Sequence, residues 1–182
     1  MNEKFAADLL EGEQLLWTGA PEACKAMDKT HKSIIVTRII ITLVIVAAAC
    51  AVMAKQGNNT GIIVASIVIG LLVIIGPFTE VNKIKKIEYA ATNQRLLCSL
   101  NGSKKAIAYS SIKDAAIKTD ADGHTNFFFG AEAIATKPTQ VRNIAALGPK
   151  ANPDGTVCER FIMYGVPNPE TLRDTLKNYI SF

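Results

Sequence analysis

The fold of this chain is decided by two apolar stretches: residues 33–54, SIIVTRIIITLVIVAAACAVMA, and residues 61–78, GIIVASIVIGLLVIIGPF. Only the six residues KQGNNT separate them. As α-helices, the two stretches would be about 33 and 27 Å long, against a hydrocarbon core of about 30 Å. A chain of 182 residues has too little remaining mass to hide two such helices in a soluble core. The sequence therefore predicts a transmembrane helical hairpin.

The distribution of basic residues predicts the orientation of this hairpin. Lys and Arg concentrate at the cytoplasmic ends of membrane spans. The connecting loop carries only Lys55, whereas the outer flanks carry seven basic residues: Lys25, Lys29, Lys32, Arg38, Lys83, Lys85 and Lys86. We therefore expect a two-pass protein of the cell (inner) membrane with both termini in the cytoplasm.

Small residues suggest where the two membrane helices pack, because lipid supplies no hydrophobic force between helices. Ala47 and Ala51 are spaced i, i+4 in the first stretch, and Ser66 and Gly70 have the same spacing in the second. The alternative is that these residues are simply common in membrane helices. Arg38, near the start of the first stretch, either extends its guanidinium to the headgroups or serves as a functional intramembrane charge.

Charge and composition exclude several classes of function. Residues 1–79 carry six basic and six acidic side chains, whereas residues 80–182 carry fourteen basic and ten acidic ones. This dispersed excess is too small for a nucleic-acid-binding protein, but it suits a domain beside an anionic membrane. Four cysteines and two histidines lack the spacing of a metal site, and no nucleotide-binding or nucleophile motif is present. We therefore expect no metal, no cofactor and no enzymatic activity.

The region after the hairpin predicts a small α+β domain. The pair Asn101-Gly102 is a strong hairpin-turn signal. We expect one strand before it and a helix beginning at Pro169, with Asn168 as its N-cap. Residues 131–155 have mixed periodicity and predict a long loop containing a short helix or strand. The other expected strands or extended segments are residues 106–110, 111–118, 124–130 and 157–164.

Several short motifs give the chain a family resemblance. They are LEGEQLLWTGAP at residues 10–21, YAATNQRLL at 89–97, SIKD at 111–114 and VPNPETL at 166–172. In this pattern the chain resembles bacterial PH-like (pleckstrin-homology-type) domain membrane proteins. The resemblance implies a seven-stranded, bent antiparallel sheet or open barrel capped by a C-terminal helix, and no known activity. Ala91 and the long stretch 131–155 depart from the family pattern.

The resulting expectation has three parts: a cytoplasmic N-terminal segment (residues 1–32), the transmembrane hairpin (33–78) and a cytoplasmic PH-like domain (79–182). Its function would be that of a membrane-anchored interaction module that binds a protein partner or the membrane surface, with weak contact to anionic lipids. The alternative is a small accessory subunit of a membrane transport complex. The candidate contact residues are Lys83, Lys85, Lys86, Arg95, Lys104, Lys105 and Phe128.

Each of these residues also has a structural interpretation. Thr92 and Asn93 would hydrogen-bond the backbone at a strand bend, with Arg95 packing its stem on the sheet. The lysines after the hairpin would set its topology, and Lys104 and Lys105 would extend a solvated turn. Phe128 would point outward, since side chains alternate along a strand and Phe127 and Phe129 would then face the core.

Overall fold

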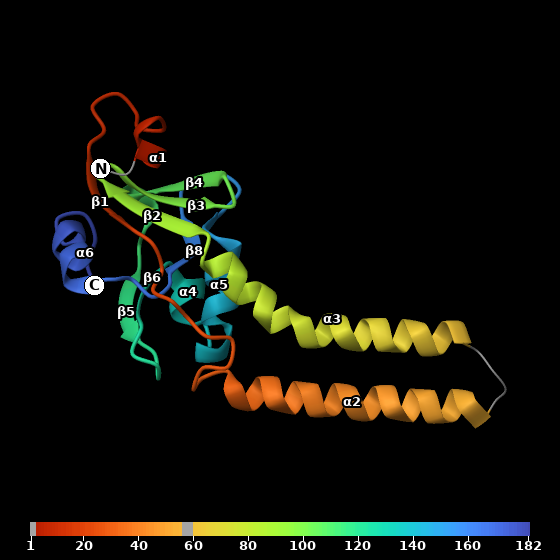
Figure 1. The fold of residues 1–182 in the computed structure, drawn as a ribbon. Coiled ribbons are helices and arrows are strands. Elements are labelled where there is room, and N and C mark those ends of the chain that lie inside the picture. Colours follow the sequence, from red (N-terminus) through yellow and green to blue (C-terminus); the bar gives the residue numbers. More distant parts are fainter. Residues whose placement is uncertain (1–2, 56–59) are drawn as a thin grey trace. The chain divides into compact units, whose positions relative to one another are not determined.

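The computed structural model describes residues 3–55 and 60–182, which belong to two compact units (Figure 1). One unit comprises residues 25–81, and the other combines the N-terminal residues up to 24 with residues 82–182. The second unit is therefore discontinuous in sequence. The boundaries predicted from the sequence, at residues 32 and 79, instead assign the residues before and after the hairpin to separate parts.

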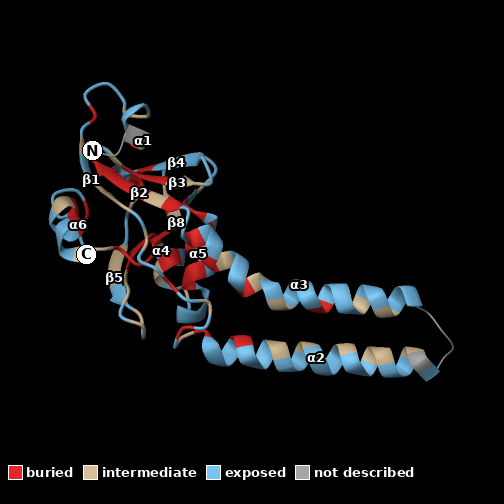
Figure 2. Ribbon diagram, viewed as in Figure 1, coloured by how far each residue is buried: buried red, intermediate tan, exposed pale blue. Residues whose placement is uncertain are grey.

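The unit of residues 25–81 is built on two long apolar helices, α2 (Lys32–Lys55) and α3 (Thr60–Ile84, whose last three residues belong to the other unit). The first turn of α2 is preceded by Asp28, whose Oδ1 accepts the His31 backbone N–H at 2.7 Å. The side chains of both helices are largely exposed (Figure 2).

Four antiparallel strands form the first sheet of the discontinuous unit, in the order β1-β2-β3-β4. Strand β1 precedes the hairpin in sequence, and β2 follows it. They nevertheless pair directly, with Thr18 opposite Ala90. The strands are β1 (Leu15–Gly19), β2 (Ile87–Thr92), β3 (Arg95–Leu100) and β4 (Ser103–Ala108).

Two turns connect neighbouring strands of this sheet, and both involve residues singled out by their sequence. Asn101 and Gly102 both have positive φ, of 50° and 83°, and connect β3 to β4 as expected from their sequence. The segment at residues 89–97 contains the second turn, which separates β2 from β3. It turns at Asn93 and Gln94, because Thr92 Oγ1 accepts the backbone N–H groups of Gln94 and Arg95 there.

The second sheet has the order β5-β6-β8-β7, and it too is antiparallel. A short 3-10 helix, η1 (Tyr109–Ser111), leads into it from β4. The described strands thus form two separate sheets and no closed barrel. The strands of this sheet are β5 (Ala115–Thr119), β6 (Thr125–Phe129), β7 (Lys150–Ala151) and β8 (Cys158–Met163).

Short helices cover parts of these sheets. Within residues 131–155 the chain forms α4 (Ala131–Ile134), a 3-10 helix η2 (Pro138–Gln140) and α5 (Val141–Leu147) before β7. A further helix, α1 (Glu3–Ala6), lies at the N-terminus. The C-terminal helix α6 (Pro169–Leu176) begins at the expected proline. Asn168 does not cap it through its side chain, because its backbone is left-handed, with φ 50°.

Tyr89 of β2 connects the two sheets inside the core. Its side chain is fully buried, and its hydroxyl oxygen accepts the Tyr164 backbone N–H at 3.1 Å. Its ring meets that of Phe161 on β8 edge-on, with the ring centroids 6.2 Å apart. Burial raises the pKa of this phenol, so the hydroxyl stays neutral and available for hydrogen bonding.

Candidate functional site

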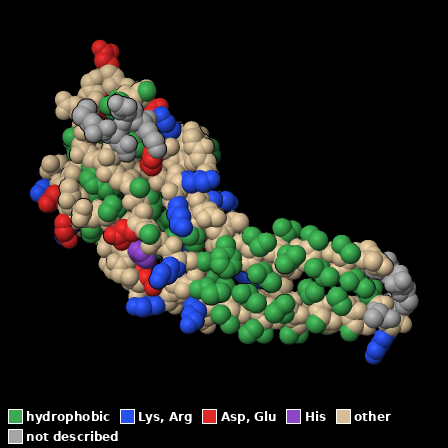
Figure 3. All heavy atoms as spheres, in the orientation of Figure 1, with side chains coloured by type: hydrophobic (Ala, Val, Ile, Leu, Met, Phe, Trp, Pro, Cys, Tyr) green, Lys and Arg blue, Asp and Glu red, His purple; other side chains and the backbone are tan. Residues whose placement is uncertain are grey.

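The outer surface of the helix pair is a continuous apolar surface. Ile40, Val44 and Ile45 of α2 are 55–62% exposed, and Ile69 and Leu72 of α3 are 61% and 66% exposed. Figure 3 shows hydrophobic side chains along both helices. Monomeric soluble proteins rarely expose an apolar patch of this extent. By length and composition, both helices could cross a membrane.

Two of the four residues expected in the helix–helix seam line the groove between the helices. Ser66 and Gly70 of α3 border a groove of about 290 Å³ that is also lined by Thr42, Val46 and Ala49 of α2. A Cβ atom on Gly70 would lie only 2.9 Å from Val46 Cγ2. The absence of a side chain at Gly70 therefore permits the close approach of α2.

The expected partners on α2 lie elsewhere. Ala47 and Ala51 are exposed in the structure, and neither lines the groove. Thr42, Val46 and Ala49, at spacings of four and three residues, form the stripe of α2 that borders the groove instead. The depth of a residue along the hairpin could be inferred from the loop, but the rotation of each helix about its own axis could not.

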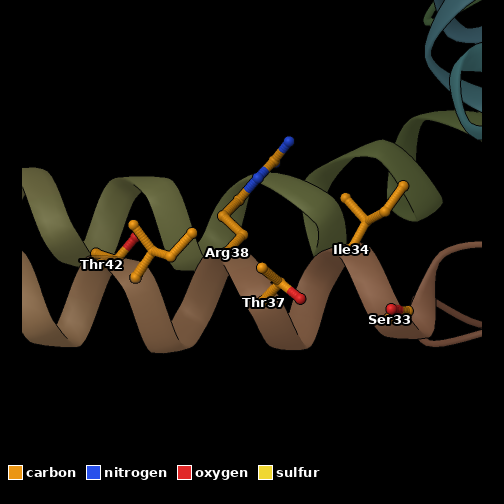
Figure 4. A pocket seen from close by; sticks show the side chains of 6 residues that line it. Ser33, Ile34, Thr37, Arg38 and Thr42 are labelled. Atoms are coloured by element: carbon orange, nitrogen blue, oxygen red, sulfur yellow. The ribbon is translucent and has the colours of Figure 1, made fainter.

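Arg38 lies on the exposed surface of α2, six residues after the helix begins. Its guanidinium points away from the helix axis (Figure 4). Ser33, Thr37 and Thr42 line the same open groove. Within residues 3–55 and 60–182, no acidic side chain pairs with Arg38. The guanidinium is about 9 Å along the helix from its start, within reach of a membrane surface at that end.

Three lysines form a basic turn, which we define as Lys83, Lys85 and Lys86. It lies at the C-terminal end of α3, and the Lys86 N–H donates to the Lys83 carbonyl at 3.1 Å. All three side chains are exposed, whereas Ile84 and Ile87 between and beside them are fully buried. The two isoleucines anchor the turn in the core and leave its three charges free to contact an anionic surface.

Strand register brings the basic turn to the same end of the first sheet as two further lysines. Ile87, the first residue of β2, pairs with Leu100, which in turn pairs with Ser103 at the start of β4. The lysines that follow, Lys104 and Lys105, therefore lie near this end. Lys105 is exposed, but Lys104 forms an ion pair with Asp8, so its charge is partly neutralised.

Arg95 does not present its charge to solvent as a contact residue would. Its Nε and Nη2 atoms each donate to a different carboxylate oxygen of Glu13 at 2.9 Å, and Nη2 also donates to the Asp8 carbonyl at 2.8 Å. The Arg95 side chain is 20% exposed and that of Glu13 is fully buried. This ion pair, the Glu13–Arg95 clamp, attaches the N-terminal segment to the start of β3.

The clamp is completed by neighbouring donors. Glu13 also accepts hydrogen bonds from Thr92 Oγ1 and the Leu10 backbone N–H, each at 2.7 Å. Burial by itself would raise the pKa of Glu13, but the hydrogen bonds from Arg95, Leu10 and Thr92, with the charge of Arg95, outweigh it and lower that pKa. Sequence reasoning missed Glu13, because its partner lies 82 residues away across the hairpin.

Asn93 extends the same attachment. Its side-chain oxygen accepts the Gln14 N–H at 2.8 Å, and its amide nitrogen donates to the Gly12 carbonyl at 3.2 Å. The structure therefore agrees with the structural interpretation for Thr92, whose hydroxyl bonds the backbone at the strand bend. What the sequence could not indicate is that the backbone held by Asn93 belongs to residues before the hairpin.

Phe128 was expected outside the core, but it is buried, with 2% of its surface exposed. Its strand does alternate, yet both faces of the second sheet are covered. Lys118 Nζ lies 5.1 Å from the centre of the Phe128 ring and also donates to the Ile134 carbonyl of α4. The segment 131–155, expected mainly as loop, supplies the helices that cover this face.

The cysteines are separate thiols in the structure. Burial raises the pKa of Cys98 to about 12 and that of Cys158 to about 11, so both thiols are protonated and poorly reactive at neutral pH. Among residues 3–55 and 60–182, no group of three or more His, Cys, Asp or Glu side chains is arranged to hold a metal ion.

In comparisons with known proteins, no family model, no curated protein and no solved structure matched this chain. Any functional assignment therefore depends on the geometry described above.

Proposed function

We propose that this chain is a two-span membrane protein of bacterial type, whose helical hairpin anchors a PH-like interaction domain at the cytoplasmic face of the cell membrane. The domain would bind a protein partner or the membrane surface there. The observation that carries this proposal is the insertion of an exposed apolar hairpin between two hydrogen-bonded strands of one sheet.

The pairing of β1 with β2 supports a hairpin with both ends on one side of the membrane. Residues 15–19 and 87–92 hydrogen-bond to each other in a folded sheet, so a membrane cannot separate them. A single span between them would place the strands on opposite sides. Two spans, as α2 and α3 would provide, return the chain to the side on which it started. The excess of basic residues at these ends supports the cytoplasmic side.

The basic turn supports contact between the domain and anionic lipid. Its three exposed lysines lie at the end of α3, Lys83 in the last turn and Lys85 and Lys86 just beyond it, where headgroups would lie if the apolar part of α3 spans the bilayer. A basic residue near an anionic surface contributes about 1 kcal/mol, so the turn would contribute about 3 kcal/mol. Such an interaction orients an already anchored domain, but it is too weak to recruit a soluble one.

Cysteine accessibility in intact cells tests the topology. A cysteine at Asn58, in the loop outside the described residues, should react with a membrane-impermeant maleimide. Cysteines at Glu11 and Ser103, one on each side of the hairpin in sequence, should react only after the cells are permeabilised. Labelling of Glu11→Cys and Ser103→Cys on opposite sides, or of both from outside, would contradict the proposed topology.

Hydrogen exchange of the full chain in nanodiscs tests the lipid contact. In discs that contain phosphatidylglycerol, amides at residues 83–88 and 101–105 should be protected more than in phosphatidylcholine discs. High salt should remove the difference, because the Debye length falls to about 3 Å at 1 M. Replacing the three lysines of the basic turn with Gln should do the same. Unchanged protection in neutral discs would refute an electrostatic contact.

A further inference from the structure

The outer edge of β5 carries backbone groups that are not hydrogen-bonded. The Gly130 N–H donates to the Asp114 carbonyl at 2.8 Å, and the Asp120 N–H donates to the His124 carbonyl at 3.0 Å. The residues that bond a neighbouring strand alternate along an antiparallel strand, so the backbone N–H and C=O groups of the even-numbered residues of β5 point toward β6. The backbone N–H and C=O groups of Ala115, Ile117 and Thr119 therefore point away from the sheet. No described residue bonds to them.

This edge lacks the usual protection against pairing. Natural sheets often guard an exposed edge with a lysine, and β5 contains Lys118. In the single chain that lysine leans over the sheet, where its Nζ donates to the Ile134 carbonyl at 2.7 Å and lies over the Phe128 ring, so it does not cover the edge. This hydrogen bond is exposed, and the ammonium group keeps two further donors for a carboxylate of an added strand. The edge strand β4 differs, since it carries the two exposed lysines Lys104 and Lys105.

Space for an added strand adjoins the edge. A groove of about 380 Å³ lies between β5 and α6, lined by Ile117 and Thr119 of the strand and by Pro169, Glu170 and Arg173 of the helix. Side chains of an added strand that point to this face of the sheet can enter the groove. The other face of β5 presents Ala116 and Lys118.

We infer that the β5 edge pairs antiparallel with β5 of a second copy of this chain, joining the two β5-β6-β8-β7 sheets into one. A two-fold axis at Ala116 places Asp114 opposite Lys118 of the second copy, and by symmetry this pair occurs twice. Asp114 is exposed and makes no ion pair with a described residue. In the same register Ala115 opposes Ile117 of the second copy, so the outward backbone groups of both residues meet.

Two of the alternative registers bring like charges together. With the axis at Ile117, Asp114 would oppose Asp120 of the second copy. With the axis at Lys118, the two lysines would face each other. Like charges directly opposite each other destabilise a strand pair. With the axis at Ala115, Asp114 would oppose Ala116 and both Asp114–Lys118 pairs would be lost, so the sequence of β5 favours the Ala116 register. The contact is isologous and closes after two copies.

Disulfide cross-linking of the full chain in native membranes tests this register. Ala116→Cys should yield a covalent dimer on mild oxidation, because paired residues of this type have Cα atoms about 4.5 Å apart, within disulfide range. Thr119→Cys, whose two copies would lie roughly 20 Å apart, should cross-link at least about tenfold more slowly. Both variants also carry Cys50→Ser, which removes the cysteine of α2; the other native cysteines, Cys24, Cys98 and Cys158, are buried.

Charge reversal provides a second measurement that does not depend on cysteine chemistry. Single-molecule photobleaching in nanodiscs should count two copies of the original chain. Asp114→Lys should abolish these dimers, and adding Lys118→Asp to that variant should restore them. Lys113→Glu, a reversal at a neighbouring exposed residue outside β5, should leave the dimer intact. Equal cross-linking at residues 116 and 119 would overturn the inference. A single copy of the chain per disc would also overturn it, whether the β5 edge is then free or is occupied by a segment of another protein.

Discussion

Replacement of Glu13 by Ala is expected to unfold the N-terminal segment from the sheet at a much lower denaturant concentration. The carboxylate accepts four hydrogen bonds, two from Arg95 and one each from Thr92 and Leu10. Removing one partner of a buried ion pair costs about 3–5 kcal/mol. Because Arg95 is 20% exposed and can recover some hydration, we expect a loss near the lower limit, about 3 kcal/mol.

Trp17 makes this loss measurable in the full chain. It is the only tryptophan, it lies in β1 four residues after Glu13, and it is half-buried. Its fluorescence during urea unfolding in detergent micelles therefore reports on the segment that the clamp holds. A double-mutant cycle with Arg95→Met should give a coupling energy of about 2 kcal/mol.

The control is Glu11→Ala, which removes an exposed carboxylate of the same segment and should change stability by less than about 0.5 kcal/mol. If Glu13→Ala and Glu11→Ala shift the Trp17 transition equally, the clamp does not hold β1 in place, and the account of the discontinuous domain fails.

Three further outcomes follow from individual contacts. Folding lowers the pKa of Glu13, so its stabilising effect is present above its ordinary pKa and is lost as the pH falls through the lowered value. The stability difference between the original chain and Glu13→Gln should therefore be full at about pH 7 and shrink below about pH 4. A difference independent of pH would exclude ionised Glu13. Gly70→Ala should destabilise helix packing in membrane-extracted protein by about 1–3 kcal/mol, since the new Cβ would lie 2.9 Å from Val46 Cγ2. Gly76→Ala should cost nothing, because a Cβ there would have no neighbour within 4 Å. Equal thermal stabilities of the two variants would place the seam elsewhere. Gly102→Ala should lower the free energy of unfolding in urea by about 1 kcal/mol, because its φ is 83°, although nothing lies within 4 Å of the new Cβ. No change would mean that the turn relaxes without cost.

Several features could be predicted because they depend on residues close together in sequence. The two apolar helices follow from runs of side chains that water does not solvate well. The β3–β4 turn follows from Asn101-Gly102, whose residues tolerate positive φ, and the start of α6 follows from Pro169. The local role of Thr92 in a strand bend was also accessible, because its hydroxyl oxygen accepts backbone N–H groups two and three residues further along the chain.

Other features depended on segments that are distant in sequence. Phe128 is buried because α4 lies over its face of the sheet, which the alternation of β6 alone cannot reveal. The stripe of α2 that faces Gly70 depends on the rotation of two helices, which a pattern of small residues does not specify.

Local patterns are enough to predict a helical hairpin followed by a small α+β region, since hydrophobic runs and turn residues act over a few neighbours. The completion of the second unit's first sheet by residues before the hairpin is visible only in the folded chain. The pairing of β1 with β2 and of Glu13 with Arg95 closes a loop of about eighty residues. Such long-range partners are selected by the free energy of the whole packed sheet and its buried charges, which no local pattern encodes.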